Sequence, residues 1–360
     1  MVLKCGILGL PNVGKSTIFN ALTKSKIATN NFPFCTINPN IGFSIIPDKR
    51  LISIQNIVKS EKILPANIKF IDIAGLVKGA SSGNGLGNKF LNNIRTVNSL
   101  IHVVRFFKNK EIHHVYNRVD PIEDINIINT ELIISDIELC EKNLSYLRYK
   151  DNDYKQHKFL LETCLYNLEN GKMLNTINFK EDERNYIKSI NFLTFKPMLY
   201  VANNDENLIN NNKFFNKIKK KIKKEKYNII NICANLELNI SNIKDYEEKE
   251  KILSKLKLKE PKLNKLINYS YKLLNMHTYF TVGEKEICAR SILIGTNALE
   301  ASGKIHTDFN KGFIRAKVIS YKNFIKYKGE LGVKKVGKIR LEGKKYIIKD
   351  GDIIQYFFNI

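Results

Sequence analysis

The sequence predicts an α/β protein with a helical insertion and a smaller α+β domain towards its C-terminal end. Over residues 1–120, short apolar runs alternate with helical stretches, which is typical of βα units and a parallel sheet. The pattern changes to helical spacing from Pro121, and from about Asn275 it returns to short β-like runs separated by glycine-bearing turns. Because 360 residues are too many for one ordinary core, two or three domains are expected.

The segments after residue 190 are expected to complete the first sheet. Five apolar runs of strand length are predicted to form it, at 4–9, 69–73, 100–106, 195–203 and 227–235. Since two of these runs follow the helical segment, that segment is interpreted as an insertion. We therefore predict a first domain formed by 1–120 and 190–274, an insertion at 121–189 and a C-terminal domain at 275–360.

Two apolar stripes at helical spacing predict that the insertion is a pair of antiparallel helices. The polar stretch YKDNDYK, residues 149–155, separates the two stripes. The first stripe comprises Ile125, Ile128, Leu132, Ile137, Cys140, Leu144 and Leu147, and the second comprises Phe159, Leu160, Cys164, Leu165 and Leu168.

The formal net charge is +24, and such a field attracts polyanions such as RNA. The alternative is that drift towards AT-rich codons enriched Lys, Asn and Ile together, regardless of function. In the densest basic run, 213–226, the residues Phe214, Ile218 and Ile222 recur every four positions, which is typical of an amphipathic helix. For that run a solvated basic face is the favoured interpretation.

The composition also argues against several classes of protein. Hydrophobic residues make up 43% of the chain but never form a run long enough for a membrane span, so no membrane association is expected. The first residues enter a strand without the features of a secretory signal. Six cysteines without a CxxC pair suit neither a zinc site nor a disulfide framework and favour a reducing cytoplasm.

Residues 9–17, GLPNVGKST, lie between the first strand and the first helix. The spacing Gly9-x4-Gly14-Lys15-Ser16 is the P-loop pattern in the context that it requires. Its glycines let backbone N–H groups close round a β-phosphate at the helix N-terminus. Lys15 would reach the β- and γ-phosphates and Ser16 would coordinate Mg²⁺. The alternative is a glycine turn that merely joins two elements.

The sequence Asp72-Ile-Ala-Gly75 follows the strand KFIDI and fits the DxxG element of nucleotide switches. Asp72 would reach Mg²⁺ through water, and the Gly75 N–H would detect the γ-phosphate. Thr36, in the preceding loop, is the candidate threonine that contacts Mg²⁺ only when a γ-phosphate is bound. The glycine-rich LVKGASSGNGLGN directly after DxxG favours a loop that reorganises when the phosphate leaves over a merely flexible one.

Together these segments resemble the YchF family of Obg-like ATPases, in the translation-factor class of P-loop proteins. The resemblance rests on GLPNVGKST, NFPFCTINPN, FIDIAGLVKGAS, YVANNDE and GKIHTDFNKGFIRA, and it runs from the first residues to the last. It implies a Ras-like P-loop domain, a coiled-coil-like helical hairpin, and a C-terminal TGS domain with an α+β β-grasp fold. It also implies association with the ribosome (rRNA of the large subunit) and hydrolysis of ATP in preference to GTP.

The motifs and the resemblance assign the site residue by residue. The nucleotide-binding residues would be Asn12, Val13, Gly14, Lys15, Ser16, Thr17, Gly75, Asn203, Asn204 and Glu206. The Mg²⁺ ligands would be Ser16, Thr36 and, through water, Asp72. We expect a monomeric cytoplasmic protein.

The base preference depends on the sequence at the end of a later strand, Asn203-Asn204-Asp205-Glu206. Guanine selectivity comes from NKxD, whose aspartate accepts two hydrogen bonds from the base. Here Asn204 replaces the lysine and the longer Glu206 replaces the aspartate, which spoils a bidentate fit. Cys233-Ala234 resembles the loop that completes the base pocket. ATP is therefore predicted, with a GTPase carrying a degenerate motif, or one using both nucleotides, as the alternative.

The position after DxxG usually holds a glutamine that orients the attacking water, but here it is Leu76. Slow intrinsic hydrolysis is therefore expected. His114 is the candidate substitute, because a neutral imidazole could align a water; a packing histidine is the alternative. His102 lies in an apolar run and is interpreted as structural. Asn12 resembles a residue that helps P-loop proteins to bind K⁺, which makes K⁺ a second candidate cofactor.

Three functions are compatible with these residues. The first is an ATP-driven switch on the ribosome, and the second is a GTPase of the same architecture. The third is a basic RNA-binding protein with a structural nucleotide. Residues 334–349 interleave lysines with Val336, Ile339, Leu341 and Tyr346, which suits a β-surface facing RNA but also any half-exposed strand pair.

Overall fold

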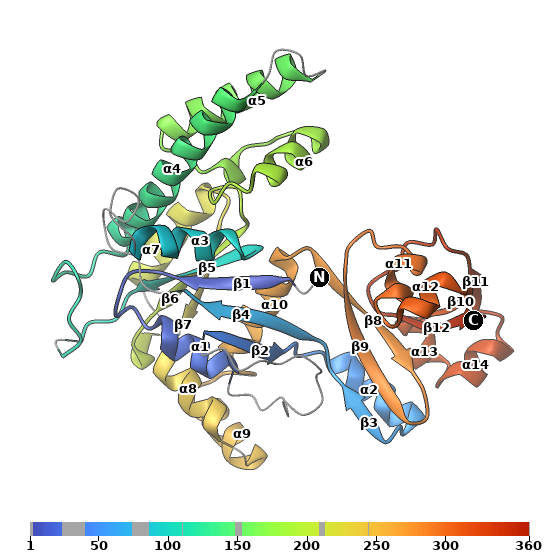
Figure 1. Ribbon diagram of the computed structural model, residues 1–360. Coiled ribbons are helices and arrows are strands. Elements are labelled where there is room, and N and C mark those ends of the chain that lie inside the picture. The colour runs from blue at the N-terminus through green and yellow to red at the C-terminus, as the bar shows by residue number, and fades with distance from the viewer. Residues whose placement is uncertain are drawn as a thin grey trace. The chain divides into compact units, whose positions relative to one another are not determined.

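The computed structural model describes residues 3–23, 40–73, 86–109, 111–147, 153–208, 213–243 and 245–359. The chain divides into two compact units (Figure 1). The first comprises residues 1–44 and 69–266, and the second comprises 45–68 and 267–360. Thr36, Gly75 and Leu76 lie outside the described residues.

The first unit is built on a six-stranded sheet with the order β2-β4-β1-β5-β6-β7. β1 pairs in parallel with both β4 and β5, and β6 pairs in parallel with β5 and β7. The strands are β1 (Lys4–Leu8), β2 (Ile41–Ile45), β4 (Asn67–Asp72), β5 (Ser99–Arg105), β6 (Met198–Asn203) and β7 (Asn228–Ile232). The predicted α/β class is confirmed, and the five predicted runs are β1, β4, β5, β6 and β7. β2 was not foreseen.

The helices of this unit join the strands and form the insertion. They are α1 (Lys15–Thr23), α3 (Leu86–Arg95), α4 (Pro121–Tyr146), α5 (Tyr154–Glu169), α6 (Glu181–Ile190), α7 (Lys213–Lys224), α8 (Ala234–Asn242), α9 (Tyr246–Lys255) and the start of α10 (Lys262–Leu273), with short 3₁₀ turns η2 (Leu174–Thr176) and η3 (Glu206–Leu208). None of the described helices combines the length and apolarity needed to cross a membrane.

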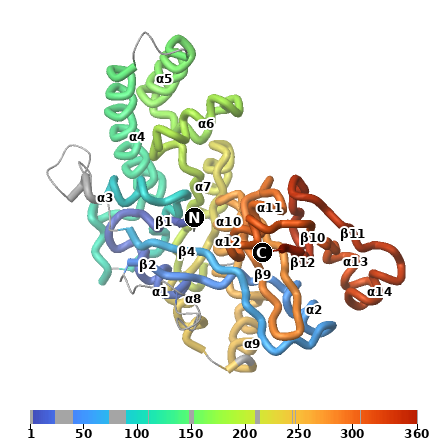
Figure 2. The backbone as a smooth tube through the Cα atoms, turned by 45° about the vertical axis from the view of Figure 1, so that its right-hand side comes forward, coloured from blue at the N-terminus to red at the C-terminus, as the bar shows by residue number. Residues whose placement is uncertain are grey.

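The predicted helical pair is α4 and α5, which lie side by side and extend away from the sheet (Figures 1 and 2). Asp120 caps α4 by accepting hydrogen bonds from the N–H groups of Ile122 and Glu123. Between the helices, the thiol of Cys140 donates to the carbonyl of Leu161 at 3.3 Å. Phe159 was wrongly placed in the buried stripe: it is 72% exposed, whereas the next two residues of the helix, Leu160 and Leu161, are buried.

α7 is amphipathic, as predicted, but its buried face is formed by Phe215, Ile218 and Ile222. This i, i+3, i+7 spacing places them on one side of the helix. Phe214, assigned to that face from the sequence, is 50% exposed. The lysines at 217, 220, 221, 223 and 224 are exposed on the opposite side, in agreement with a solvated basic face.

The second unit contains a mixed six-stranded sheet with the order β11-β10-β12-β8-β9-β3. Its strands are β3 (Lys62–Leu64), β8 (Met276–Val282), β9 (Glu286–Leu293), β10 (Phe313–Ser320), β11 (Arg340–Glu342) and β12 (Asp352–Phe358). Its helices are α2 (Lys49–Val58), the end of α10, α11 (Ala298–Gly303), α12 (Thr307–Lys311), α13 (Tyr321–Lys326) and α14 (Glu330–Lys335). The predicted α+β domain is therefore present, and its assignment as a β-grasp (TGS) domain stays a prediction.

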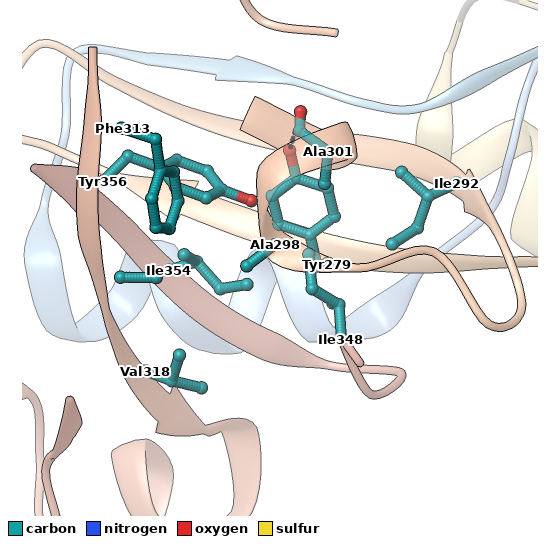
Figure 3. Packing of buried hydrophobic residues seen from close by; sticks show 10 residues of the cluster. Tyr279, Ile292, Ala298, Ala301, Phe313, Val318, Ile348, Ile354 and Tyr356 are labelled. Carbon is teal, nitrogen blue, oxygen red and sulfur yellow. Dashed lines mark hydrogen bonds between the residues drawn. The ribbon is translucent and has the colours of Figure 1, made fainter. Parts of the chain in front are cut away.

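The core of the second unit is aromatic and aliphatic (Figure 3). Tyr279 and Tyr356 pack edge to face, with ring centroids 6.4 Å apart, and Phe313 lies against Tyr356 at 6.1 Å. The Tyr279 hydroxyl donates to the carbonyl of Ala301 at 3.4 Å, so α11 is tied to β8. The basic segment 334–349 is not the strand pair considered above, because only Arg340–Glu342 is a strand and α14 ends at Lys335.

Residues 45–68, from the last residue of β2 to the first residues of β4, belong to the second unit. Arg50 at the start of α2 forms ion pairs with Asp48 at 2.7 Å and with Asp350 at 2.8 Å. β3 extends the second sheet by pairing in parallel with β9. In the predicted division this segment falls within 1–120; the three-domain division as a whole stays a prediction.

Candidate nucleotide-binding site

The loop between β1 and α1 has the conformation that its glycines allow. Gly9 and Gly14 have φ angles of 153° and 96°, in the region that favours glycine. A Cβ atom on Gly14 would lie 2.3 Å from Nδ2 of Asn203, and one on Gly9 would lie 2.4 Å from the carbonyl oxygen of Val103. Any side chain at either position would therefore displace the loop from β5 or β6.

Lys15 begins α1 and is buried, with 8% of its surface exposed. Its Nζ donates to the carbonyl oxygen of Leu10 at 2.7 Å, across the mouth of the loop. Burial lowers the pKa of Lys15 to about 8, and the carboxylate of Asp72 opposes this shift. A polyphosphate in the loop would give the ammonium group of Lys15 an anionic partner in place of the neutral carbonyl.

Ser16 and Asp72 meet at the end of β4. The Ser16 hydroxyl donates to Oδ2 of Asp72 at 2.8 Å. Oδ1 of Asp72 is buried and has no hydrogen-bond partner among the described residues. Burial raises the pKa of Asp72, while the bond from Ser16 and the charge of Lys15 lower it. A hydroxyl beside an unsatisfied carboxylate oxygen fits Mg²⁺ with its bound water; the third predicted ligand, Thr36, lies outside the described residues.

Asn203 joins the two halves of the site. Its Nδ2 donates to the carbonyl of Val13 at 2.9 Å, and its Oδ1 accepts from the N–H of Ala234 at 3.0 Å. Asn203 is buried. In this conformation both of its polar atoms are bound to backbone groups, so it holds the phosphate loop against the start of α8. Its predicted direct contact with a nucleotide stays a prediction.

A cavity of about 460 Å³ opens beside these residues at the carboxyl ends of the strands. Its walls include all the predicted nucleotide-binding residues of the described chain except Val13, which is buried behind the loop. Asn204 is tied to β7, because its Nδ2 donates to Oδ1 of Asn231 at 2.6 Å. Glu206 begins η3 and lies on the wall with Asp205.

Six residues that no sequence motif marks also line this cavity: Phe107, Asn109, Ile112, Asn235, Leu236 and Asn239. The last three follow Cys233-Ala234 on α8, and helical spacing after that motif was the signal available for them. The first three follow the end of β5. Only their position after a strand that neighbours β1 could have indicated them.

His114 is buried, and both of its ring nitrogens are engaged. Nε2 lies 3.1 Å from Oδ2 of Asp124, and Nδ1 accepts from the N–H of Tyr116 at 3.2 Å. Orienting a water would require one of these bonds to break. His102, interpreted as structural, lies buried in β5 against Tyr200, with ring centroids 5.2 Å apart, and burial lowers its pKa to about 3.

His114→Ala is expected to lower the free energy of unfolding by about 2–4 kcal/mol, because it leaves Oδ2 of the buried Asp124 without its hydrogen bond, and of the described contacts of this carboxylate only the ion pair of Oδ1 with Arg118 remains. The exposed neighbour His113→Ala is the matched control and should change stability little. Urea denaturation measures the loss, and turnover is then compared at a temperature where both variants are folded. Unchanged turnover of His114→Ala would remove it from the catalytic set.

The lowered pKa of Lys15 predicts a pH dependence of nucleotide binding. A bound polyphosphate favours the charged amine and raises its pKa, so binding takes up a proton above about pH 8. The dissociation constant of ADP should be flat below that pH and then rise towards roughly tenfold per pH unit. Lys15→Ala should abolish the slope; a slope that persists in this variant would assign it to another group.

A glycine-rich loop between a parallel strand and a helix, a buried lysine, and a Ser–Asp pair beside a cavity define a nucleotide-binding protein of the P-loop class. The family model described as "50S ribosome-binding GTPase" matches residues 4–136. The model YchF-GTPase_C, described as "Protein of unknown function", matches residues 276–359.

Whole-length relatives define the family. The chain is 49% identical to the ribosome-binding ATPase YchF of Escherichia coli O157:H7 and 43% identical to that of Bacillus subtilis (strain 168), with 100% of each chain covered. The solved structure of the Schizosaccharomyces pombe YchF GTPase matches with a TM-score of 0.89 at 37% identity, covering 99% of this chain and 97% of that one. The chain belongs to the YchF family, as the motifs indicated.

Proposed function

We propose that this protein is a Mg²⁺-dependent ATPase with slow intrinsic turnover that acts as a nucleotide-controlled switch on the ribosome. The observation that carries the proposal is the Ser16–Asp72 pair, with its unsatisfied carboxylate oxygen, next to Lys15 at the mouth of the cavity. The printed names of the bacterial relatives, which call them ribosome-binding ATPases, support the same function.

Within this mechanism the chain's own residues bind and orient the nucleotide. Lys15 would leave the carbonyl of Leu10 to contact the β- and γ-phosphates, and Ser16 with Asp72 would hold Mg²⁺. Mg²⁺ supplies charge stabilisation of the phosphoryl oxygens when bound. Because position 76 is a leucine, which cannot orient the attacking water, fast hydrolysis would require a group supplied by the partner.

Asn12 is the proposed K⁺ ligand beside the phosphates. It has a φ angle of 61°, and its Nδ2 donates to the carbonyl of His113 at 3.1 Å. Its Oδ1 is therefore the atom of this amide that suits a cation. Equal hydrolysis rates in K⁺ and Na⁺ would contradict this role.

Adenine is the proposed base because the NKxD aspartate and lysine are both replaced. The amide of Asn204 is directed to Asn231 on β7, and the carboxylate of Glu206 stands at the start of an exposed 3₁₀ turn. Titration of the purified protein with Mg²⁺–ATP and Mg²⁺–GTP tests the preference, and we expect tighter binding of ATP. Tighter binding of GTP would favour the alternative, a GTPase of the same architecture; the S. pombe relative is named a GTPase.

The ribosome is the proposed partner, and its RNA would meet a chain with a net charge of +24. Because phosphate contacts release counterions, affinity for ribosomes should fall steeply with salt. It should also differ between ADP and a non-hydrolysable ATP analogue. Cosedimentation with ribosomes measures both effects. Binding that ignores the nucleotide would favour a basic RNA-binding protein with a structural nucleotide, and absence of binding would exclude both ribosomal functions.

A further inference from the structure

Arg105 is a buried arginine at the carboxyl end of β5, only 2% exposed. Its guanidinium group donates three hydrogen bonds, to the carbonyl oxygens of Phe107 at 3.3 Å, Asn109 at 2.9 Å and Ile112 at 2.8 Å. Within the described part of the chain it forms no ion pair with a carboxylate. A buried charge costs free energy unless its hydrogen bonds are made. The three bonds therefore favour the one backbone conformation of the following residues that brings these carbonyl groups to the guanidinium group.

That segment, residues 106–109 and 111–113, is here called the wall segment. Phe107, Asn109 and Ile112 line the cavity, so the three carbonyl groups that Arg105 binds belong to three residues of its wall. The carbon centre of the guanidinium lies 4.3 Å from the centroid of the Phe107 ring. One side chain therefore fixes both the backbone of the wall segment and its aromatic ring.

Two further bonds place the wall segment next to the rest of the site. Nδ2 of Asn12 in the phosphate loop donates to the carbonyl of His113 at 3.1 Å. The N–H of Lys108 donates to Oδ2 of Asp205 at 3.2 Å, directly after Asn203-Asn204. The wall segment thus runs from the phosphate loop to the motif that distinguishes the bases, and it brings apolar groups of Phe107 and Ile112 to that side of the cavity.

We propose that Arg105 is a positioning residue for the side of the cavity that receives the base and sugar. This role rests on the proposed nucleotide-binding function. The planar guanidinium group carries five donors in a fixed arrangement, which suits three carbonyl groups at once, whereas the ammonium group of lysine is a single point charge. The polyphosphate side, formed by the backbone of residues 12–17, receives none of the three bonds from Arg105, and of the residues that the structure describes it shares only the bond from Asn12 to His113 with the wall segment.

The variant Arg105→Lys distinguishes the contribution of the base and sugar side of the cavity to nucleotide binding from that of the polyphosphate side. Binding of Mg²⁺–ADP and of Mg²⁺–pyrophosphate is measured by calorimetry for the wild type and the variant. We expect ADP affinity to fall by at least about tenfold and pyrophosphate affinity to stay within about twofold. Arg184→Lys, an exposed arginine on α6 that does not line the cavity, is the matched control and should bind both ligands as the wild type does.

Three results would overturn the proposal: unchanged ADP affinity in Arg105→Lys, equal losses for both ligands, or no pyrophosphate binding by the wild type. If circular dichroism shows that this variant does not fold, Phe107→Leu carries the test. It removes the ring that the guanidinium group holds at the cavity wall, so it should show the same selective loss. A wild-type protein that binds no ADP would instead contradict the nucleotide-binding function itself.

Discussion

Lys15→Ala is expected to lower the rate of ATP hydrolysis by roughly 10²–10³-fold, the cost of removing one preorganised charge from a reacting phosphoryl group. Stability should not fall with activity. Burial lowers the pKa of Lys15 to about 8, so its charged form is less favourable in the folded than in the unfolded protein at neutral pH. We expect the free energy of unfolding of the nucleotide-free variant to stay within about 1 kcal/mol of wild type.

Lys196→Ala is the matched control for this prediction. Lys196 is also buried, and burial lowers its pKa to about 8 as well. Its Nζ, however, donates to the carbonyls of Arg95 and Val97 and to Oδ1 of Asn191, away from the cavity. This variant should lose stability in urea denaturation while keeping its turnover per folded molecule. Unchanged steady-state hydrolysis by Lys15→Ala would contradict the proposed mechanism.

Local signals were enough for the parts of the site that lie on regular elements. Gly9, Gly14, Lys15 and Ser16 follow a strand and open a helix, and the fold does bring Asp72 from a neighbouring strand to the Ser16 hydroxyl. Neighbouring parallel strands end at the same edge of a sheet, so motifs at those ends meet without further information. For the same reason Asn203, at the end of β6, lies beside the phosphate loop.

Features that depend on long-range packing could not be predicted in this way. No local pattern marks residues 45–68 as part of the second unit, since the contacts that place them there come from residues such as Asp350, 300 positions away from Arg50. His114 has the composition of a catalytic candidate, but only the fold reveals that Asp124 and Tyr116 engage both of its nitrogens. Arg105 ends a strand-like run, and nothing in its neighbours discloses that its guanidinium group binds three carbonyls.

Asn203→Ala is expected to disrupt both stability and nucleotide binding. The buried side chain makes one hydrogen bond to Val13 and one to Ala234, and its loss leaves a carbonyl and an N–H group without partners. Each unsatisfied buried group costs roughly 1–3 kcal/mol, so the free energy of unfolding should fall by about 2–4 kcal/mol. Because the same bonds hold the phosphate loop against the start of α8, ADP affinity should fall by at least about tenfold.

The comparison with Asn239→Ala decides whether this effect comes from the two hydrogen bonds that Asn203 makes to Val13 and Ala234. Asn239 also lines the cavity but is exposed on α8, so its removal should cost little stability. Urea denaturation and ADP titration are measured on both variants. Since Asn203 binds only backbone groups in this conformation, Asn203→Ala should weaken Mg²⁺–ADP and Mg²⁺–GDP by the same factor. If Asn203→Ala instead lowers affinity for only one of the two nucleotides and leaves stability unchanged, Asn203 contacts the base directly. Other bonds would then hold the phosphate loop against the start of α8.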